Sequence, residues 1–474
     1  MTRSAKLAAA LVTALLAACG VNHAEGPPLP DSTQTAAFLD TLEERTFHYF
    51  WDLTNTTNGL TPDRSPSPSF SSIAAVGFAL TAYPIGVERG YITRDDARQR
   101  VLTTLRFFWT APQDSTTTGA VTGYRGFFFH FLDMNSGTRF QQVELSTIDT
   151  ALLLAGVLTC QSYFDGTDAV ETEIRDLADS IYARADWQWA SPRAPLVALG
   201  WHPESGFLGY DWQGYNEAMI LYILALGSPK HPVDLAAWSA WDSTYQWGTF
   251  GGQTHLGFAP LFGHQYSHVW IDFREIQDPF MRARGIDYFE NSRRATYAQR
   301  AYAIANPNGW RGYGDAVWGL SASDGPADVT LTIGGRPRQF HTYFARGASF
   351  TEIQDDGTIT PTAAGGSIPF APEIAIPALW TMRRTYGANL FSTYGFLDAF
   401  NPTFTGAPTM GHVVAGVGWF DTDYLGIDQG PILVMIENYR TGLVWRLMRG
   451  NQYIVRGLCR AGFSGGWLAS RCPP

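Results

Sequence analysis

The sequence predicts an all-α fold with small β-hairpin insertions, and three observations lead to this prediction. From residue 35 onward, apolar residues recur with a period of about 3.6, as they do on the buried face of a helix. The intervening loops are rich in aromatic residues and in glycine and proline, which interrupt helices. Composition does not change abruptly between residues 35 and 465, which favours one large domain. The predicted helices cover residues 35–54, 71–89, 93–110, 145–163, 168–186, 215–227, 233–245, 264–278, 292–305, 371–386, 430–448 and 451–462.

Several of these helices carry recognisable start or stop signals. Thr93 stands three residues before Asp96, which resembles a capping box with Asp in place of Glu. Asp168 is a favourable N-cap for the helix that follows it. Gly227 and Gly450 come directly after apolar runs and mark helix ends.

Two stretches break the helical pattern and are predicted to form β-hairpins. The first is 123–143, where an aromatic run is followed by a turn signal at 135–137. The second is 328–350, with Gly334 and Gly335 at its turn. The helix count agrees with a ring of helical hairpins and equally with a generic bundle, so the pattern alone leaves both open.

The N-terminus has the features of an export signal. Arg3 and Lys6 precede an apolar run over 7–18 that is too short to cross a bilayer. Small residues before Cys19 resemble a bacterial lipobox, in which cleavage leaves a lipid on that cysteine. We therefore expect an exported protein, anchored in the cell envelope on the periplasmic or outer-membrane face only through the lipid on Cys19. The predicted organisation is a signal peptide over 1–18, a flexible tether over 19–34 and the catalytic domain over 35–474.

Three further cysteines follow the lipobox. In an oxidising compartment the close pair Cys459 and Cys472 is expected to form a disulfide that pins the C-terminus. Cys160 lies inside an apolar helical run and is expected to be a buried thiol.

Charge and motif content exclude several classes of function. The net charge is −10 and no basic patch is visible, which argues against nucleic-acid binding. The sequence contains no GxSxG elbow, P-loop or GxGxxG turn after a strand. His264 and His268 stand four residues apart without the glutamate of a metalloprotease motif. We therefore expect no metal and no organic cofactor, and we expect a monomer.

Carboxylates at the starts of apolar helices are the remaining candidates for chemistry. Glu144 and Asp149 lie five residues apart across one helix start, and Glu217 opens a nearly uninterrupted apolar helix. A carboxylate that faces a core needs a partner or a function, which favours a functional role for Asp149 and Glu217. Asp324 and Asp428 also lie near helix starts, where capping explains them as well as function does.

Paired carboxylates are what the hydrolysis of a glycosidic bond requires. One carboxyl must be protonated to release the leaving oxygen, and the other must be ionised to activate water or to attack directly. The apolar helix beside Glu217 is expected to raise the pKa of its carboxyl, which suits the acid role. Tryptophans in the loops offer flat faces on which sugar rings stack.

Seven ordered strings then resemble the bacterial glucoamylase-like domain family, which includes the endo-β-1,2-glucanases and resembles a domain of cyclic β-1,2-glucan synthases. The resemblance runs from about residue 36 to 463. The strings are Ser146-Thr-Ile-Asp149 through Gly156, Tyr215-Asn-Glu217 through Pro229, His268-Val-Trp-Ile-Asp272-Phe-Arg274, Trp318 through Asp324-Gly-Pro326, Pro361 through Gly366 with Phe370-Ala-Pro-Glu373, Tyr394 through Pro402, and Asp428-Gln-Gly-Pro431 with Glu437-Asn-Tyr-Arg440.

This resemblance implies an (α/α)6 toroid and a set of site residues. Glu217 resembles a catalytic acid of the β-1,2-glucanases, and the segment from Glu144 to Asp149 resembles the one that supplies further essential carboxylates. Which of Glu144, Asp149 and Asp133 takes which role stays open. The predicted substrate-binding residues are Asp133, Trp212, Tyr215, His268, Trp270, Asp272, Arg274, Trp318, Asp324, Glu373 and Asp428.

The sequence therefore predicts a glycoside hydrolase that cleaves β-1,2-glucan or its oligosaccharides by paired-carboxylate acid/base catalysis with inversion. Two alternatives remain at this point: a glycan-binding lipoprotein without activity, and a phosphorylase or transglycosylase on the same fold. Exo or endo mode is left open, because it depends on loops that the sequence does not place.

Overall fold

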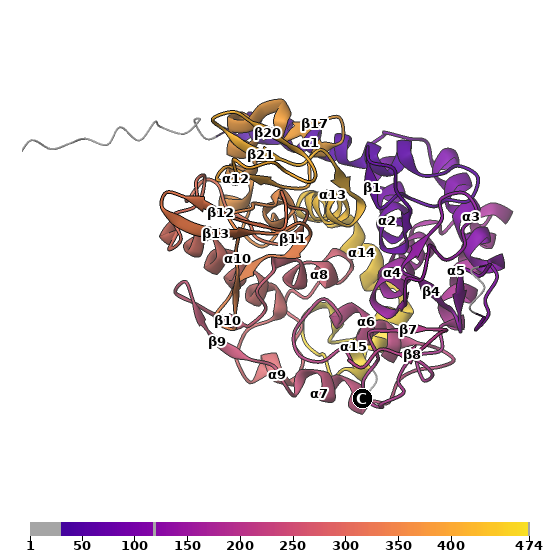
Figure 1. Ribbon diagram of the computed structural model, residues 1–474. Coiled ribbons are helices and arrows are strands. Elements are labelled where there is room, and N and C mark those ends of the chain that lie inside the picture. Colours follow the sequence, from indigo (N-terminus) through magenta and orange to yellow (C-terminus); the bar gives the residue numbers. More distant parts are fainter. Residues whose placement is uncertain (1–29, 117–119, 473–474) are drawn as a thin grey trace, which may run out of the picture.

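The computed structural model describes residues 30–116 and 120–472, so the predicted signal peptide and Cys19 lie outside the described residues. The fold is helix-rich (Figure 1). The helices are α1 (Ser32–Leu53), α2 (Ile73–Glu88), α3 (Arg94–Thr110), α4 (Thr147–Tyr163), α5 (Ala169–Arg184), α6 (Met219–Gly227), α7 (Ala236–Asp242), α8 (Tyr266–Trp270), α9 (Pro279–Arg282), α10 (Tyr288–Ala305), α11 (Pro361–Gly365), α12 (Pro372–Tyr386), α13 (Gly426–Arg440), α14 (Leu443–Gly450) and α15 (Gln452–Arg460), with 3-10 turns η1 (Leu261–His264), η2 (Gly387–Asn389) and η3 (Gly466–Leu468).

Short strands fill the connections between the helices. They are β1 (Arg64–Ser65), β2 (Ser71–Ser72), β3 (Gly123–Tyr124), β4 (Phe127–Phe129), β5 (Phe131–Leu132), β6 (Leu145–Ser146), β7 (Gly200–His202), β8 (Gly206–Phe207), β9 (Trp247–Phe250), β10 (Gln253–Leu256), β11 (Ala322–Ser323), β12 (Val329–Ile333), β13 (Arg336–Phe340), β14 (Phe344–Ala345), β15 (Gly347–Ala348), β16 (Ile353–Gln354), β17 (Phe391–Ser392), β18 (Gly395–Phe396), β19 (Phe400–Asn401), β20 (His412–Val414), β21 (Gly418–Phe420) and β22 (Tyr424–Leu425).

The helices form an inner and an outer set that differ in sequence pattern. In α2, α4, α6 and α13 nearly every side chain is buried, as expected of helices that are apolar on all sides. In α1, α3 and α5 only one face is buried, and charged residues cover the other. Figure 1 shows α3 and α5 at the edge of the molecule, with α2 and α4 inside them.

The inner helices contact one another in succession. Helix α2 packs against both α4 and α13, α4 packs against α6, and α8 packs against α6 and α13. Helix α11 packs against α13, and the Gln265 side chain just before α8 donates to the carbonyl oxygen of Ala363 in α11 at 2.8 Å. Helices α2 and α13, the first and the last of these inner helices along the chain, therefore lie side by side.

Helices α2 and α4 approach closely because each has a glycine at the crossing. A Cβ atom on Gly156 would lie 2.1 Å from the carbonyl oxygen of Gly77, and a Cβ atom on Gly77 would lie 2.3 Å from that of Leu152. Any side chain at these two positions would push the helices apart. This contact fixes the middle of α4 against α2.

A five-stranded sheet, in the order β3-β4-β6-β7-β8, lies next to the start of α4. Its β6 strand runs directly into α4, and β4 pairs with β6 in antiparallel register through Phe128↔Ser146 and Phe129↔Leu145. This pairing brings His130, which follows β4, next to Glu144, which precedes β6. The His130 backbone N–H donates to the Glu144 carbonyl oxygen at 2.9 Å.

The two predicted hairpins have different outcomes. The prediction for 328–350 is confirmed, because β12 and β13 pair from Val329↔Phe340 to Ile333↔Arg336 around Gly334 and Gly335. In 123–143 a tight turn falls at Arg125 and Gly126, which both have positive φ, and the predicted turn around 135–137 is also present, because Leu132 pairs with Arg139 across it. The strands there belong to two sheets and do not form one simple hairpin.

Two predicted helices are wrong in extent. The predicted helix 264–278 ends at Trp270, because Ile271 is extended and Asp272 binds the backbone N–H and guanidinium of Arg274 in a loop. The predicted helix 430–448 is two helices, since Gly442 adopts a left-handed conformation between α13 and α14. Helix α13 starts at Gly426, whose N–H donates to the carbonyl oxygen of Asp63 at 2.8 Å.

The cysteines behave as the sequence predicts. Cys459 and Cys472 form a disulfide with a Cα–Cα distance of 5.4 Å. Cys160 is a buried free thiol in α4. Within residues 30–116 and 120–472, no helix combines the length and apolar character that crossing a membrane requires.

Candidate active site

A cavity of about 190 Å³ lies at the N-terminal ends of several inner helices. Helix α4 contributes Asp149, the turn before α6 contributes Glu217, and α8 contributes Tyr266. The complete lining is His130, Ile148, Asp149, Leu152, Glu217, Phe262, Tyr266, Ala322, Tyr343 and Ile427. Apolar side chains thus surround a small number of ionisable groups, which is an arrangement that shifts pKa values.

Glu217 lies in the turn that precedes α6, two residues before the helix starts. Ser267 of α8 fixes this turn, because its hydroxyl donates to the Glu217 carbonyl oxygen at 3.0 Å and accepts from the Ile220 N–H at 3.0 Å. Glu217 is partly accessible through the cavity that it lines. Burial of its carboxyl raises the pKa to about 7, and the negative charge of Asp149 adds to the effect. The Glu217 carboxyl therefore holds a proton near neutral pH.

Asp149 occupies the first turn of α4 and is only 5% exposed. Its backbone N–H donates to the hydroxyl of the N-cap residue Ser146, and the same hydroxyl donates to its carboxylate oxygen Oδ2. His130 Nε2 lies 3.5 Å from that same oxygen. Ser146 and His130 thus fix the position of the Asp149 carboxylate at the start of α4.

His130 connects two carboxylates. Its Nδ1 lies 2.7 Å from Glu144 Oε1, and its Nε2 faces Asp149. Burial lowers the pKa of His130, but the charges of Asp149 and Glu144 outweigh burial and raise it to about 9. Burial opposes ionisation of Glu144 as well, but the hydrogen bond and charge of His130 lower its pKa below the usual range. We call Glu144, His130 and Asp149 the histidine-linked group.

Sequence reasoning missed His130, although it quoted the aromatic run that contains it. A lone histidine within an apolar segment gives little signal by itself. Its role becomes visible only when the pairing of β4 with β6 places it between Glu144 and Asp149.

Two further predicted carboxylates lie near the opposite wall of the cavity. Asp428 is buried in the first turn of α13, directly after the cavity residue Ile427. Burial raises the pKa of Asp428 to about 7. Asp324 follows β11 and accepts a hydrogen bond from the Arg64 guanidinium at 2.6 Å. The structure thus brings Glu144, Asp149 and Glu217 together, with Asp324 and Asp428 behind the facing wall.

The predicted aromatic site residues lie in the packing around the cavity and are absent from its lining in the described chain. Trp270 and Trp318 are completely buried, and Trp270 donates to the Thr81 hydroxyl at 2.9 Å. Trp212 donates to the Thr147 hydroxyl at 3.0 Å and so supports the start of α4. Tyr215 is buried and stacks on Tyr288.

The remaining predicted polar residues have structural partners away from the lining. Asp133 accepts the backbone N–H groups of residues 135 and 136 and shapes an exposed turn. Asp272 pairs with Arg274 at 2.7 Å and with Arg449. Glu373 pairs with Arg293 at 2.7 Å on the surface. His268 is buried, and burial lowers its pKa to about 3, so it is neutral.

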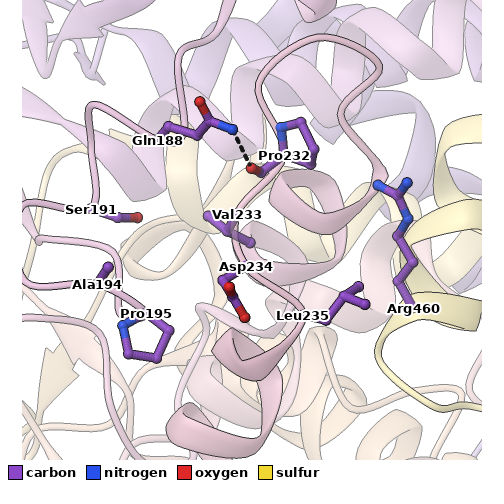
Figure 2. Close-up of a pocket in the computed structure, with 9 residues that line it drawn as sticks. All are labelled: Gln188, Ser191, Ala194, Pro195, Pro232, Val233, Asp234, Leu235 and Arg460. Carbon is purple, nitrogen blue, oxygen red and sulfur yellow. Dashed lines mark hydrogen bonds between the residues drawn. The ribbon is translucent and has the colours of Figure 1, made fainter.

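A larger hollow of about 520 Å³ lies on the outside, between the loop before β7 and the segment that leads into α7 (Figure 2). Gln188 bridges its two sides by donating to the Pro232 carbonyl oxygen at 3.2 Å. Its lining has Asp234 as its one carboxylate, so it lacks the pair that acid/base chemistry on a glycoside needs. The full lining is Gln188, Ser191, Ala194, Pro195, Pro232, Val233, Asp234, Leu235 and Arg460.

Fold and cavity together define a helix-rich protein with a cavity lined by the carboxyl groups of Asp149 and Glu217. Residues 209–452 match the Glycoamylase family, described as "Putative glucoamylase", and this match covers more than half of the chain. The chain therefore belongs to this family, as the resemblance seen in the sequence predicts.

Individual relatives cover nearly the whole domain. A crystal structure of a Bacteroides uniformis protein of the same description has a TM-score of 0.77 and 30% identity, covering 93% of this chain and 100% of that one. An endo-β-1,2-glucanase from Chitinophaga pinensis, solved with sophorotriose and glucose, has a TM-score of 0.78 and 27% identity, covering 92% and 99%.

A third relative is longer than this chain. An exo β-1,2-glucooligosaccharide sophorohydrolase (non-reducing end) from Parabacteroides distasonis is 28% identical over 457 residues, which is 89% of this chain. The chain spans 57% of that relative's length.

Proposed function

We propose that this protein is a glycoside hydrolase that cleaves β-1,2-linked glucan or its oligosaccharides. The observation that carries the proposal is the Glu217 carboxyl, whose pKa burial raises to about 7, in one cavity with the carboxyl group of Asp149. An acid and a base held together are the minimum for hydrolysis of a glycosidic bond. The linkage is proposed from the relatives, because one is a β-1,2-glucanase and another acts on β-1,2-glucooligosaccharides.

In the proposed mechanism, Glu217 is the general acid and Asp149 is the general base. Glu217 donates its proton to the glycosidic oxygen as the bond to the anomeric carbon breaks. Asp149 accepts a proton from a water molecule, and the water oxygen bonds to the anomeric carbon from the opposite face, which inverts its configuration. Burial of Glu217 and the charge of Asp149 separate the protonation states of the two groups, which is how one site obtains an acid and a base at one pH.

His130 and Ser146 support the base role of Asp149. The Ser146 hydroxyl donates a hydrogen bond to Asp149 Oδ2, and His130 Nε2 lies 3.5 Å from the same oxygen, which leaves Oδ1 as the oxygen to accept a proton from water. Glu144 holds the far side of the imidazole through Nδ1. Glu144 is therefore a positioning residue in this proposal.

We also propose that the fold is an (α/α)6 toroid. The proposed inner ring is α2, α4, α6, α8, α11 and α13. The contacts from α2 through α4, α6 and α8, and from α11 through α13 back to α2, support closure. The hydrogen bond from Gln265 to Ala363 supports a link between α8 and α11. A crystal structure in which these six helices fail to close would contradict the assignment.

A screen of glucans with defined linkages tests the proposed activity. Reducing ends released from β-1,2-, β-1,3-, β-1,4-, β-1,6- and α-1,4-glucans should appear only with the β-1,2 substrate, without phosphate in the buffer. Proton NMR at early times should show the α-anomer of the new reducing end. Product that depends on phosphate would indicate a phosphorylase, and a ladder of longer products would indicate a transglycosylase. Glucan binding by calorimetry without any product would indicate a binding protein.

We propose further that the protein is exported and carries a lipid on Cys19. Support comes from the basic, apolar and small-residue order of 1–19. Cells fed a labelled fatty acid should incorporate the label into the protein and lose it in Cys19→Ala. Equal labelling of the two proteins would contradict the proposal.

A further inference from the structure

Three buried aspartates, Asp324, Asp398 and Asp421, converge from separate loops. They follow β11, β18 and β21 respectively, and each is 3% exposed or less. Each offers a carboxylate oxygen, and the three oxygens lie within 4.8 Å of one another. We call these residues the aspartate cluster.

Two oxygens of the aspartate cluster are buried without a hydrogen-bond donor anywhere in residues 30–116 and 120–472: Asp398 Oδ1 and Asp421 Oδ2. The other oxygen of each residue is well satisfied. Asp398 Oδ2 accepts the Asp324 N–H at 2.7 Å, and Asp421 Oδ1 accepts the Thr422 N–H at 2.7 Å. A buried carboxylate oxygen without a donor costs free energy, so these two atoms indicate a missing ligand.

Charge around the aspartate cluster is poorly balanced. Arg64 pairs with Asp324 at 2.6 Å and also faces Asp63 at 3.3 Å and Asp423 at 4.0 Å. Arg346 also lies close to the cluster, but its guanidinium is held by Asp356 through two hydrogen bonds of 2.7 and 2.8 Å. The ionisable and charged groups that face the cluster in the described chain are Asp63, Arg64, Asp423, Asp428, Tyr343 and Arg346, with Asp428 within hydrogen-bond reach of Asp398.

We propose that Asp324, Asp398 and Asp421 bind a divalent cation of the size of Ca²⁺. Ca²⁺ takes oxygen ligands at about 2.3–2.6 Å, so two ligands on opposite sides of the ion lie about 4.6–5.2 Å apart. Mg²⁺ usually keeps several waters and is bound through one or two carboxylates, whereas Ca²⁺ accepts a larger set of protein oxygens. The three carboxylate oxygens of the cluster lie within 4.8 Å of one another, close enough to share one Ca²⁺. Water completes the coordination shell, and the sequence-based expectation of a metal-free protein is revised.

The cation would act on the structure of the cavity wall. Tyr343 lines the cavity and lies close enough to Asp398 and Asp428 for their charges to raise the pKa of its hydroxyl. A cation in the aspartate cluster ties the loops after β11, β18 and β21 together behind that wall. The binding proposal is independent of the proposed hydrolase function, because binding is measured without substrate.

Calorimetry with CaCl₂ at pH 8 tests the site directly, using protein freed of metal with EDTA. The wild type should bind one Ca²⁺, and Asp421→Asn should bind at least tenfold more weakly. Asp278→Asn is the matched control, because Asp278 is equally buried but is satisfied by Trp238, Tyr288 and the Met281 N–H. It should bind Ca²⁺ like the wild type. Absence of binding to the wild type at millimolar Ca²⁺ would overturn the proposal without bearing on the hydrolase activity.

Thermal unfolding separates a cation site from a set of shared protons. Ca²⁺ should raise the Tm of the wild type at pH 8, more than Mg²⁺ does, because a ligand that binds the folded state stabilises it. Asp421→Asn should have a higher calcium-free Tm than the wild type at pH 8 and no response to Ca²⁺. A higher Tm for Asp421→Asn together with a wild type that ignores Ca²⁺ would show that the cluster holds protons and no cation. The wild-type titration alone decides the question if the variant does not fold.

Discussion

The histidine-linked group and the aspartate cluster are both sets of buried carboxylates, but they differ in the positively charged side chain that lies beside them. In the first, the His130 imidazole lies between Glu144 and Asp149 and contacts both. In the second, Arg64 forms an ion pair with one member, Asp324, while Arg346, the other nearby guanidinium, is held by Asp356.

This difference changes the protonation of the same kind of residue. The pKa of Glu144 lies below its usual range, whereas that of Asp421 rises to about 8. Burial alone disfavours every charged carboxylate, so a nearby positive charge decides which carboxylates stay ionised. The histidine-linked group is thus suited to supply a base at neutral pH, and the aspartate cluster is suited to hold a cation or protons.

Asp149→Asn should cause the largest change in activity, because it removes the proposed base from the histidine-linked group. We expect kcat on β-1,2-glucan to fall by about 10²–10⁴-fold, the usual contribution of general acid/base catalysis. Asp133→Asn is the control, since Asp133 shapes an exposed turn and its amide oxygen still accepts the same N–H groups. Initial rates of reducing-end release measure both variants, and equal losses would remove the special role of Asp149.

Gly156→Ala should disturb the helix that supports the histidine-linked group. This helix, α4, carries Asp149 and carries no member of the aspartate cluster. The added Cβ would lie 2.1 Å from the Gly77 carbonyl oxygen and force α2 and α4 apart. We expect the free energy of unfolding to fall by about 1–3 kcal/mol. Gly450→Ala has open space around the new Cβ and should change stability little. Urea unfolding measures both, and a neutral Gly156→Ala would contradict the close approach.

His130→Gln should have the smallest effect on the rate and should be most visible in the pH dependence. Glutamine still donates a hydrogen bond but cannot carry the charge that lowers the pKa of Glu144. We expect kcat/KM at neutral pH to fall roughly tenfold, about 1.4 kcal/mol. The pH profile of kcat/KM should also change shape, because the variant lacks the positive charge that His130 carries up to about pH 9. A profile that keeps its shape would assign His130 a packing role only.

Features that depend on local pattern were predictable from the sequence, whereas those assembled from distant segments were not. The apolar helices α2 and α4 and the caps at Thr93 and Asp168 follow directly from residue spacing. The break after Trp270 depends on the Arg449 and Arg274 pairing of Asp272, which spacing does not reveal.

The site residues also divide into those that local sequence pattern predicts and those that distant segments bring together. Glu217 and Asp149 were found because each is a charged residue at the mouth of an apolar helix. His130 reaches them through strand pairing, and Asp398 and Asp421 join Asp324 from loops far apart in the chain. Asp398 gives no signal of its own in the sequence, since a carboxylate in an aromatic loop has many ordinary explanations.

The most direct test of the account is the pH dependence of hydrolysis by the wild type and by Glu217→Gln. The wild type should lose kcat/KM on β-1,2-glucan as pH rises through about 7, because Glu217 must carry a proton to act as the acid. Glu217→Gln should bind the glucan, turn it over about 10²–10⁴-fold more slowly, and lack that alkaline limb. Full turnover by Glu217→Gln, or an alkaline limb that persists in it, would contradict the assignment of Glu217 as the acid.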